Sequence, residues 1–209
     1  MIEYHKIQTV FKRDPETNFK TLIDGEFALP EFHYLAYNDW VFTEKVDGTN
    51  IRVMFNGIGL KFGGKTDNAQ IPTPLANKLN ERFFPQIELF KETFHDSDVC
   101  LYGEGYGAKI QKGGNYRPDQ DFVLFDVKIG EWWLQRDDVE NIANVLGLDI
   151  VPIIGHGTLF NMISVVECGL SSKWNDNFIA EGIVARPATE LKARNGSRII
   201  TKIKHKDFK

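Results

Sequence analysis

Six strand-like runs, separated by few helical patterns, constrain the fold of this chain more than any other feature. Each run is rich in β-branched or aromatic residues, as strands are. The runs span 40–44, 49–55, 99–104, 122–127, 178–184 and 197–204. Helical periodicity predicts helices over 74–84, 136–146 and, more weakly, 159–168. Because strands and helices do not alternate regularly, the pattern predicts an α+β fold with mostly antiparallel sheets flanked by helices, not a doubly wound parallel sheet.

Charge is distributed unevenly along the chain. The 209 residues together carry a net charge of -4, which argues against a general nucleic-acid coat protein. Residues 192–209 hold seven basic side chains and one acidic side chain, a net charge of +6, which leaves -10 on the rest of the chain. A basic tail by itself indicates a solvated face or a disordered end as readily as a binding site.

The sequence gives no sign of secretion or membrane insertion. No apolar run approaches the roughly 20 residues that span a bilayer, and the N-terminal residues lack the apolar core of a signal peptide. Cys100 and Cys168 fit no metal-binding pattern, and we predict that both are buried thiols. We therefore expect a soluble protein of the cytoplasm (the host cytoplasm if the source is viral) with no membrane partner.

A glycine-rich stretch at 103–108 formally fits the dinucleotide-binding fingerprint. That kind of site needs a helix that begins at the glycines, so that its N-terminus can hold the pyrophosphate. The residues at 109–116 have no apolar helical period, so we reject a Rossmann site here.

The segment Lys45-Val46-Asp47-Gly48 lies between two strand-like runs. An ordinary Asp-Gly hairpin with exposed charges would explain it. A lysine held near carboxylates and other cations is also a candidate covalent nucleophile, because neighbouring cations or desolvation help its ammonium to lose the proton that blocks attack.

Four further features strengthen the second interpretation. Glu104 ends a strand, Phe125 lies in the apolar strand 122–127, and Glu181 enters another strand. Lys202 and Lys204 are two residues apart and should point to one face of the last strand. Together these groups suit nucleotidyl transfer: the carboxylates can hold a divalent cation or a ribose hydroxyl, the lysines can neutralise a phosphate, and the aromatic ring can stack on a base.

This order of motifs resembles the covalent nucleotidyltransferase superfamily of polynucleotide ligases and capping enzymes. It looks most similar to the phage-type ATP-dependent RNA ligase family. Asn50 favours that branch, because DNA ligases and capping enzymes usually carry an arginine at its position. Lys65 stands where the family normally has an arginine, and a lysine cannot make the planar bidentate contact of arginine.

The resemblance implies a role for each motif residue. Lys45 would be the nucleophile that forms a lysyl-AMP intermediate. Glu104 would contact the ribose or support the metal, and Glu181 would bind that metal, Mg²⁺ or Mn²⁺. Asn50 would help to position the phosphate that is joined. The resemblance leaves the role of Asp47 open.

The remaining implied contacts concern the nucleotide. Phe125 would stack on adenine, with Phe122 as the alternative. Lys65 would hold a phosphate or ribose oxygen, and Lys202 and Lys204 would hold the α-phosphate. The face of Arg52 could not be assigned from the sequence, and the loop 109–117 could contact nucleic acid, the triphosphate or only solvent.

The implied fold is the ATP-grasp-like adenylation domain of ligases. We expect residues 1–209 to form a single adenylyltransferase domain with no separate C-terminal OB or helical domain. The implied activity uses ATP to join a 5′-phosphate end of RNA to a 3′-hydroxyl end. A DNA nick ligase, a capping-type guanylyltransferase and a non-catalytic nucleic-acid-binding relative remain alternatives.

Overall fold

The computed structural model describes residues 3–208, and these divide into two compact units. The first unit comprises residues 3–5 and 47–151, and the second comprises residues 6–46 and 152–208. The first unit is thus almost continuous in sequence, whereas the second is assembled from both ends of the chain.

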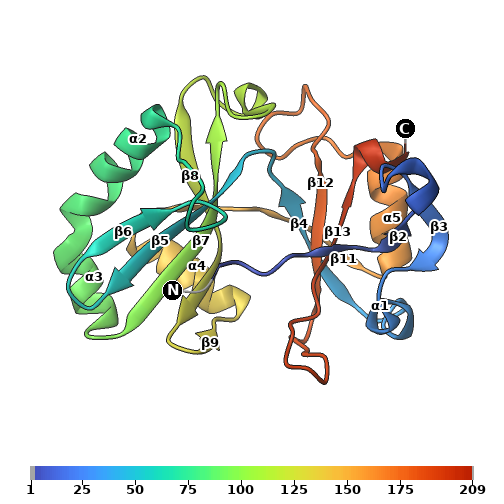
Figure 1. Cartoon of the computed structure of the whole chain (residues 1–209), viewed down its shortest axis with the longest axis horizontal. Coiled ribbons are helices and arrows are strands. Elements are labelled where there is room, and N and C mark those ends of the chain that lie inside the picture. The colour runs from blue at the N-terminus through green and yellow to red at the C-terminus, as the bar shows by residue number, and fades with distance from the viewer. Residues whose placement is uncertain (1–2, 209) are drawn as a thin grey trace. The chain divides into compact units, whose positions relative to one another are not determined.

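The first unit is built on a sheet whose long strands β5, β7 and β8 lie side by side (Figure 1). The strand order is β10-β8-β7-β5-β6, with β9 added beside β8. The described pairs are antiparallel except β10 with β8. The strands are β5 (Thr49–Asn56), β6 (Leu60–Gly63), β7 (Asp98–Gly107), β8 (Gln120–Ile129), β9 (Trp132–Trp133) and β10 (Asp149–Ile150).

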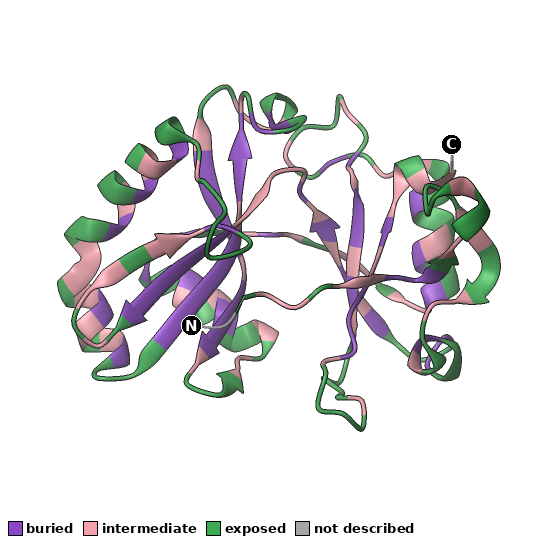
Figure 2. Cartoon of the chain, viewed as in Figure 1, coloured by how far each residue is buried: buried purple, intermediate pink, exposed green. Residues whose placement is uncertain are grey.

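Helices cover one face of this sheet and form the core of the first unit with it. Leu75, Leu79 and Phe83 of α2 and Phe90 of α3 pack with alternate residues of β5 such as Ile51. Figure 2 shows β5, β7 and β8 as largely buried strands. The helical segments are α2 (Thr73–Phe83), η2 (Phe84–Gln86), α3 (Ile87–Phe94), η3 (Gly113–Asn115) and α4 (Arg136–Val145).

The second unit holds a five-stranded sheet in the order β1-β13-β12-β4-β11 and a separate hairpin of β2 and β3. The strands are β1 (Gln8–Thr9), β2 (Phe11–Arg13), β3 (Leu22–Phe27), β4 (Trp40–Lys45), β11 (Ile153–Gly157), β12 (Gly182–Pro187) and β13 (Thr201–Lys204). The helical segments are η1 (Pro15–Thr17), α1 (Pro30–Tyr34), α5 (Leu159–Cys168) and η4 (His205–Phe208). Leu159, Met162 and Val166 of α5 pack on the sheet with Trp40 and Ile203, which gives this unit its own core.

The α+β prediction with mostly antiparallel sheets is confirmed, and the predicted helices occur as α2, α4 and α5. Two predicted strands are too long. Residues 178–180 do not extend β12, because the N–H of Ala180 donates to Leu170 O at 2.8 Å and the segment pairs with that loop. Residues 197–199 likewise pair with 191–193, so β13 begins only at Thr201.

Two further differences concern a helix and a cysteine. The helix α3 was not predicted, since Pro85 in the turn η2 interrupts the apolar pattern before it. The prediction of two buried thiols is wrong for one of them. Cys100 is buried in β7, but Cys168 ends α5 on its solvent side and is exposed. None of the helices among residues 3–208 has the length and apolar character to cross a membrane.

Candidate active site

Lys45 is the last residue of β4, and its side chain lies on the face of the second sheet opposite the core. Along β4 the buried residues alternate, with Trp40 and Phe42 facing the core and Lys45 on the other side. The Lys45 side chain is 19% exposed. The position is therefore accessible, but most of the side chain is packed.

The strand register brings a carboxylate and a second lysine to Lys45. Gly182, the first residue of β12, pairs with Lys45 on one side and with Lys204 of β13 on the other. Glu181 precedes it, and its carboxylate forms ion pairs with the ammonium groups of both Lys45 and Lys204, the latter at 2.5 Å. Three motif residues far apart in sequence thus meet at one end of the sheet.

Glu181 is ionised in this arrangement. Burial would raise the pKa of Glu181, but the Lys45 ammonium and the hydrogen bonds from Lys204 and Lys45 outweigh burial and lower that pKa below its ordinary value. The carboxylate therefore keeps a negative charge between two cations.

Gly182 has no room for a side chain. A Cβ at this position would lie 2.0 Å from the carbonyl oxygen of Ile203 and 2.8 Å from the Cα of Lys204. Gly182 thus allows β12 to approach β13 closely, and this close approach positions the neighbouring Glu181 carboxylate.

Lys202 lies on the same face as Lys204, as the period-two spacing predicts. Lys202 and Lys204 are half-buried, whereas the alternate residues Thr201 and Ile203 are buried. Ile203 lies in the core of the unit, so the two lysines lie on the opposite face. Val184 of β12 pairs with both Lys202 and Thr43. Lys202 is therefore two residues further along the strands than the register position that Lys45 and Lys204 share.

In the first unit, Asn50 of β5 lies directly opposite Glu104 of β7. Since Ile51 is in the core, both side chains lie on the sheet face that the helices leave open. Oδ1 of Asn50 is buried and has no hydrogen-bond partner among the described residues. A buried acceptor without a partner is unfavourable, so this atom is suited to a ligand donor.

Gly48 lets the strand end approach β7 closely. A Cβ on Gly48 would lie 2.3 Å from Gly105 O and 2.8 Å from Cγ of Glu104. The hydroxyl of Tyr116 accepts a hydrogen bond from the N–H of Asp47 at 3.2 Å. The loop 109–117, whose role the sequence left open, therefore supports the backbone of the Lys-x-Asp-Gly turn.

Phe125 reaches the open face because of a β-bulge. Tyr102 pairs with Asp126 and Gly103 with Leu124, so Phe125 is the extra residue of β8. It packs with Tyr102 and stacks edge-on against Tyr4, at 5.1 Å between ring centroids. The alternative Phe122 is fully buried and packs on Phe83 in the core, so it is not available to a base.

Lys65 is exposed in the loop after β6, and a buried arginine shapes that loop. Arg52 is fully buried on β5, and its guanidinium donates to Gly64 O at 2.9 Å and to Asp67 Oδ1 at 2.8 Å. Arg52 thus binds the chain on both sides of Lys65, through the backbone of Gly64 and the side chain of Asp67. The sequence signal for this role was an arginine within an otherwise apolar strand.

Sequence reasoning missed one buried acid next to Lys45. Glu44 is 1% exposed and accepts hydrogen bonds from the Ser172 hydroxyl and the N–H of Lys173, both at 2.7 Å. Burial raises the pKa of Glu44 despite these bonds. The contact ties the strand that carries Lys45 to the loop before β12.

The glycines at 103–107 lie within β7 and are followed by a loop and the short turn η3. No α-helix begins at these glycines, so this segment lacks the helix N-terminus that a Rossmann site requires.

The residues present fit a partial site for a divalent cation. Among residues 3–208 no three His, Cys, Asp or Glu side chains cluster as a preformed metal cage. Mg²⁺ commonly takes one or two carboxylates, with waters and substrate phosphates as its other ligands. Glu181 suits such a site because it is ionised and lies on the sheet face that carries the lysines.

Comparison with known proteins decides the family. A family model described as RNA ligase matches residues 38–204. The chain belongs to the RNA ligase family. No curated protein matches it by sequence.

Solved structures of the RNA ligase of Naegleria gruberi share the fold. A point mutant with ATP and Mn has a TM-score of 0.68 and 17% identity, covering 97% of this chain and 56% of that one. The same ligase with PPi has a TM-score of 0.66 and 17% identity, covering 97% and 57%. An apo point mutant has a TM-score of 0.66 and 16% identity, covering 99% and 58%. This chain therefore spans less than two thirds of the length of these ligases.

Proposed function

We propose that this protein is an ATP-dependent RNA ligase that acts through a lysyl-AMP intermediate on Lys45. The observation that carries the proposal is the ion-paired group in which the Glu181 carboxylate joins Lys45 to Lys204. Membership of the RNA ligase family supports it, as do the structures of the Naegleria gruberi enzyme with ATP and Mn and with PPi.

In the proposed first step, Nζ of Lys45 attacks the α-phosphorus of ATP. A nitrogen–phosphorus bond forms, the bond to the oxygen that bridges to the β-phosphate breaks, and pyrophosphate leaves. Attack requires that the ion pair with Glu181 opens and that the ammonium gives up its proton. Lys202 and Lys204 would stabilise the negative charge that develops on the α-phosphate.

In the later steps AMP passes from Lys45 to a 5′-phosphate end, and a 3′-hydroxyl then attacks that end and releases AMP. A bound Mg²⁺ or Mn²⁺ would neutralise charge at the phosphates. Glu181 is the proposed metal ligand of the second unit, and Glu104 of the first unit is proposed to contact the ribose or support the metal. Asn50 would help to position the phosphate to be joined, Lys65 would contact a phosphate or ribose oxygen, and Phe125 would stack on adenine. We also propose that the whole chain serves as one adenylyltransferase domain and works in the cytoplasm.

The test is the intact mass after incubation with ATP and magnesium. We expect the wild type to gain the mass of one AMP, and Lys45→Ala to gain nothing. Lys61→Ala is the matched control, since Lys61 is an exposed lysine of β6, and should still gain AMP. The AMP should then leave the protein when a 5′-phosphorylated RNA is added.

A parallel incubation with GTP separates a ligase from a capping-type enzyme. If the wild type, after pretreatment with pyrophosphate to remove any bound AMP, gained no mass with either nucleotide, the proposed activity would be wrong. Gain with GTP alone would replace the ligase by a guanylyltransferase.

A further inference from the structure

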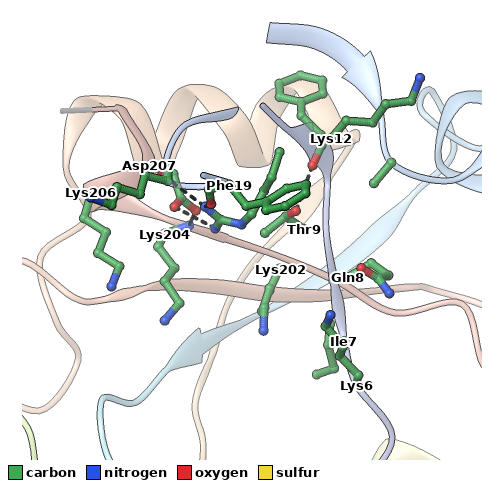
Figure 3. A pocket seen from close by; sticks show the side chains of 14 residues that line it. Lys6, Ile7, Gln8, Thr9, Lys12, Phe19, Lys202, Lys204, Lys206 and Asp207 are labelled. Carbon is green, nitrogen blue, oxygen red and sulfur yellow. Dashed lines mark hydrogen bonds and ion pairs between the residues drawn. The ribbon is translucent and has the colours of Figure 1, made fainter. Parts of the chain in front are cut away.

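A broad cationic cavity of about 850 Å³ lies within the second unit, beside β13. Its lining includes seven cationic side chains and one carboxylate: Lys6, Lys12, Arg13, Lys20, Lys202, Lys204, Lys206 and Asp207. Figure 3 shows Lys202, Lys204 and Lys206 extending to the same side of β13. The cavity thus continues from the proposed α-phosphate lysines on to further cations.

Part of this positive charge has no counter-charge among residues 3–208, whereas Lys204 pairs with Glu181. Asp207 is engaged by Arg13 at 2.9 Å and by the N–H of Lys204 at 3.1 Å. Lys12 forms an exposed ion pair with Glu26 and points away from the other lysines in Figure 3. Lys6, Lys20 and Lys206 form no ion pair with a carboxylate among residues 3–208. An anionic ligand would compensate these charges.

An aromatic ring is held at the same cavity. Phe19 is 61% exposed, and its backbone has φ of 60°, a left-handed conformation that is uncommon for a bulky residue. Its N–H donates to Asp14 O at 2.9 Å, and its carbonyl accepts from Arg13. The turn therefore keeps the ring out of the apolar core and leaves its face accessible for stacking with a base.

We propose that this cavity binds a single-stranded segment of the polynucleotide substrate, with phosphates against Lys6 and Lys206 and a base stacked on Phe19. Cations that follow the backbone, combined with an exposed aromatic side chain, are the usual elements of single-strand binding. Pyrophosphate would satisfy the lysines but has no ring for Phe19. The inference rests on the proposed function for the identity of the substrate, and it concerns residues that have no role in AMP transfer.

The test measures binding of a fluorescent, 5′-phosphorylated single-stranded RNA by anisotropy, without ATP, over a series of salt concentrations. Lys6→Ala/Lys206→Ala should weaken binding and reduce the slope of log K against log salt by about 1.4, since each single-strand phosphate contact contributes about 0.7. Phe19→Ala should weaken binding at least about five-fold with an unchanged slope, and Phe19→Tyr should restore it.

Lys192→Ala is the matched control, because Lys192 is an exposed lysine of the same unit outside the cavity, and should bind as the wild type does. All variants should still gain AMP. Unchanged RNA affinity in both the lysine and the Phe19 variants would overturn the inference while leaving the ligase proposal intact. Slower AMP gain in the lysine variants with unchanged RNA affinity would show a pyrophosphate site instead. If the lysine and Phe19 variants lost RNA affinity but the wild type gained no AMP, the result would support RNA binding in the cavity and refute the proposed ligase activity.

Discussion

At the scale of single residues, Glu181 determines the charge of the candidate active site. Its carboxylate is shared by two ammonium groups that belong to motifs 159 positions apart, Lys45 and Lys204. Without that carboxylate the two cations would face each other at a partly buried position. The residue therefore has a structural role before any nucleotide binds, in addition to its proposed role as a metal ligand.

Glu181→Gln should lower the free energy of unfolding by about 2 kcal/mol at pH 7, the usual value of a hydrogen bond to a charged group. The pKa of Glu181 is lowered in the folded protein, so its contribution is complete above the ordinary value of 4.5 and is lost as the pH falls below it. Urea unfolding of wild type and variant at pH 7 and in steps below pH 4.5 should show the difference shrinking. A difference that stays constant with pH would contradict the assignment.

The two cysteines should differ in reactivity. Burial raises the pKa of the Cys100 thiol to about 11, whereas Cys168 is exposed at the end of α5. A disulfide reagent at pH 8 should therefore modify one thiol in the native protein and a second only after denaturation. Cys168→Ser should abolish the fast reaction. Two fast thiols would show that β7 does not shield Cys100.

At the scale of secondary structure, the close pairing of β12 with β13 keeps the lysines and Glu181 in register. Gly182→Ala places a Cβ against Ile203 O, so the strands must separate. We expect a loss of about 1–3 kcal/mol in the free energy of unfolding and a slower gain of AMP. Gly59→Ala is the control, because a Cβ there meets no atom within 4 Å, and it should change stability by less than about 0.5 kcal/mol. Equal effects in the two variants would refute the argument.

At the scale of the whole molecule, each unit has its own apolar core. Residues that are adjacent in sequence can differ strongly in how far that core buries them. Phe83 is fully buried in the core of the first unit, whereas Phe84 is 47% exposed. Phe83→Ala should cost about 3–5 kcal/mol in urea unfolding, because it removes contacts and leaves a cavity. Phe84→Ala should cost about 1 kcal/mol or less, since it loses mainly its ring contact with Phe62. Similar losses would mean that α2 packs differently.

Much of the candidate site could be predicted from the sequence, because each motif lies on or beside a regular element. The alternation of β4 predicts which face carries Lys45, and the spacing of Lys202 and Lys204 predicts that they share a face. Local periodicity is sufficient for such statements, since the side-chain direction on a strand depends only on its neighbours.

Other features depended on tertiary contacts. Counting by twos from Val127 puts Phe125 on the core face of β8, whereas counting from Leu124 puts it on the open face. The bulge opposite Tyr102 and Gly103 decides for the open face. The sequence did not assign Arg52 to either face of its strand. Its hydrogen bonds to Gly64 and Asp67 in the loop after β6 show where its side chain lies. The cavity beside β13 joins residues 6–28 to residues 202–207, which no local pattern connects.

The sequence by itself determined the fold class, the family and the side-chain chemistry of the motifs, because these follow from residue types, short-range periodicity and the order of motifs. Only the tertiary structure decided that Glu181 bridges Lys45 and Lys204, that Cys168 is exposed, and that Phe19 stands at a cationic cavity. The physical reason is that strand register, bulges and loop closure are set by long-range packing and hydrogen bonds between segments distant in the chain.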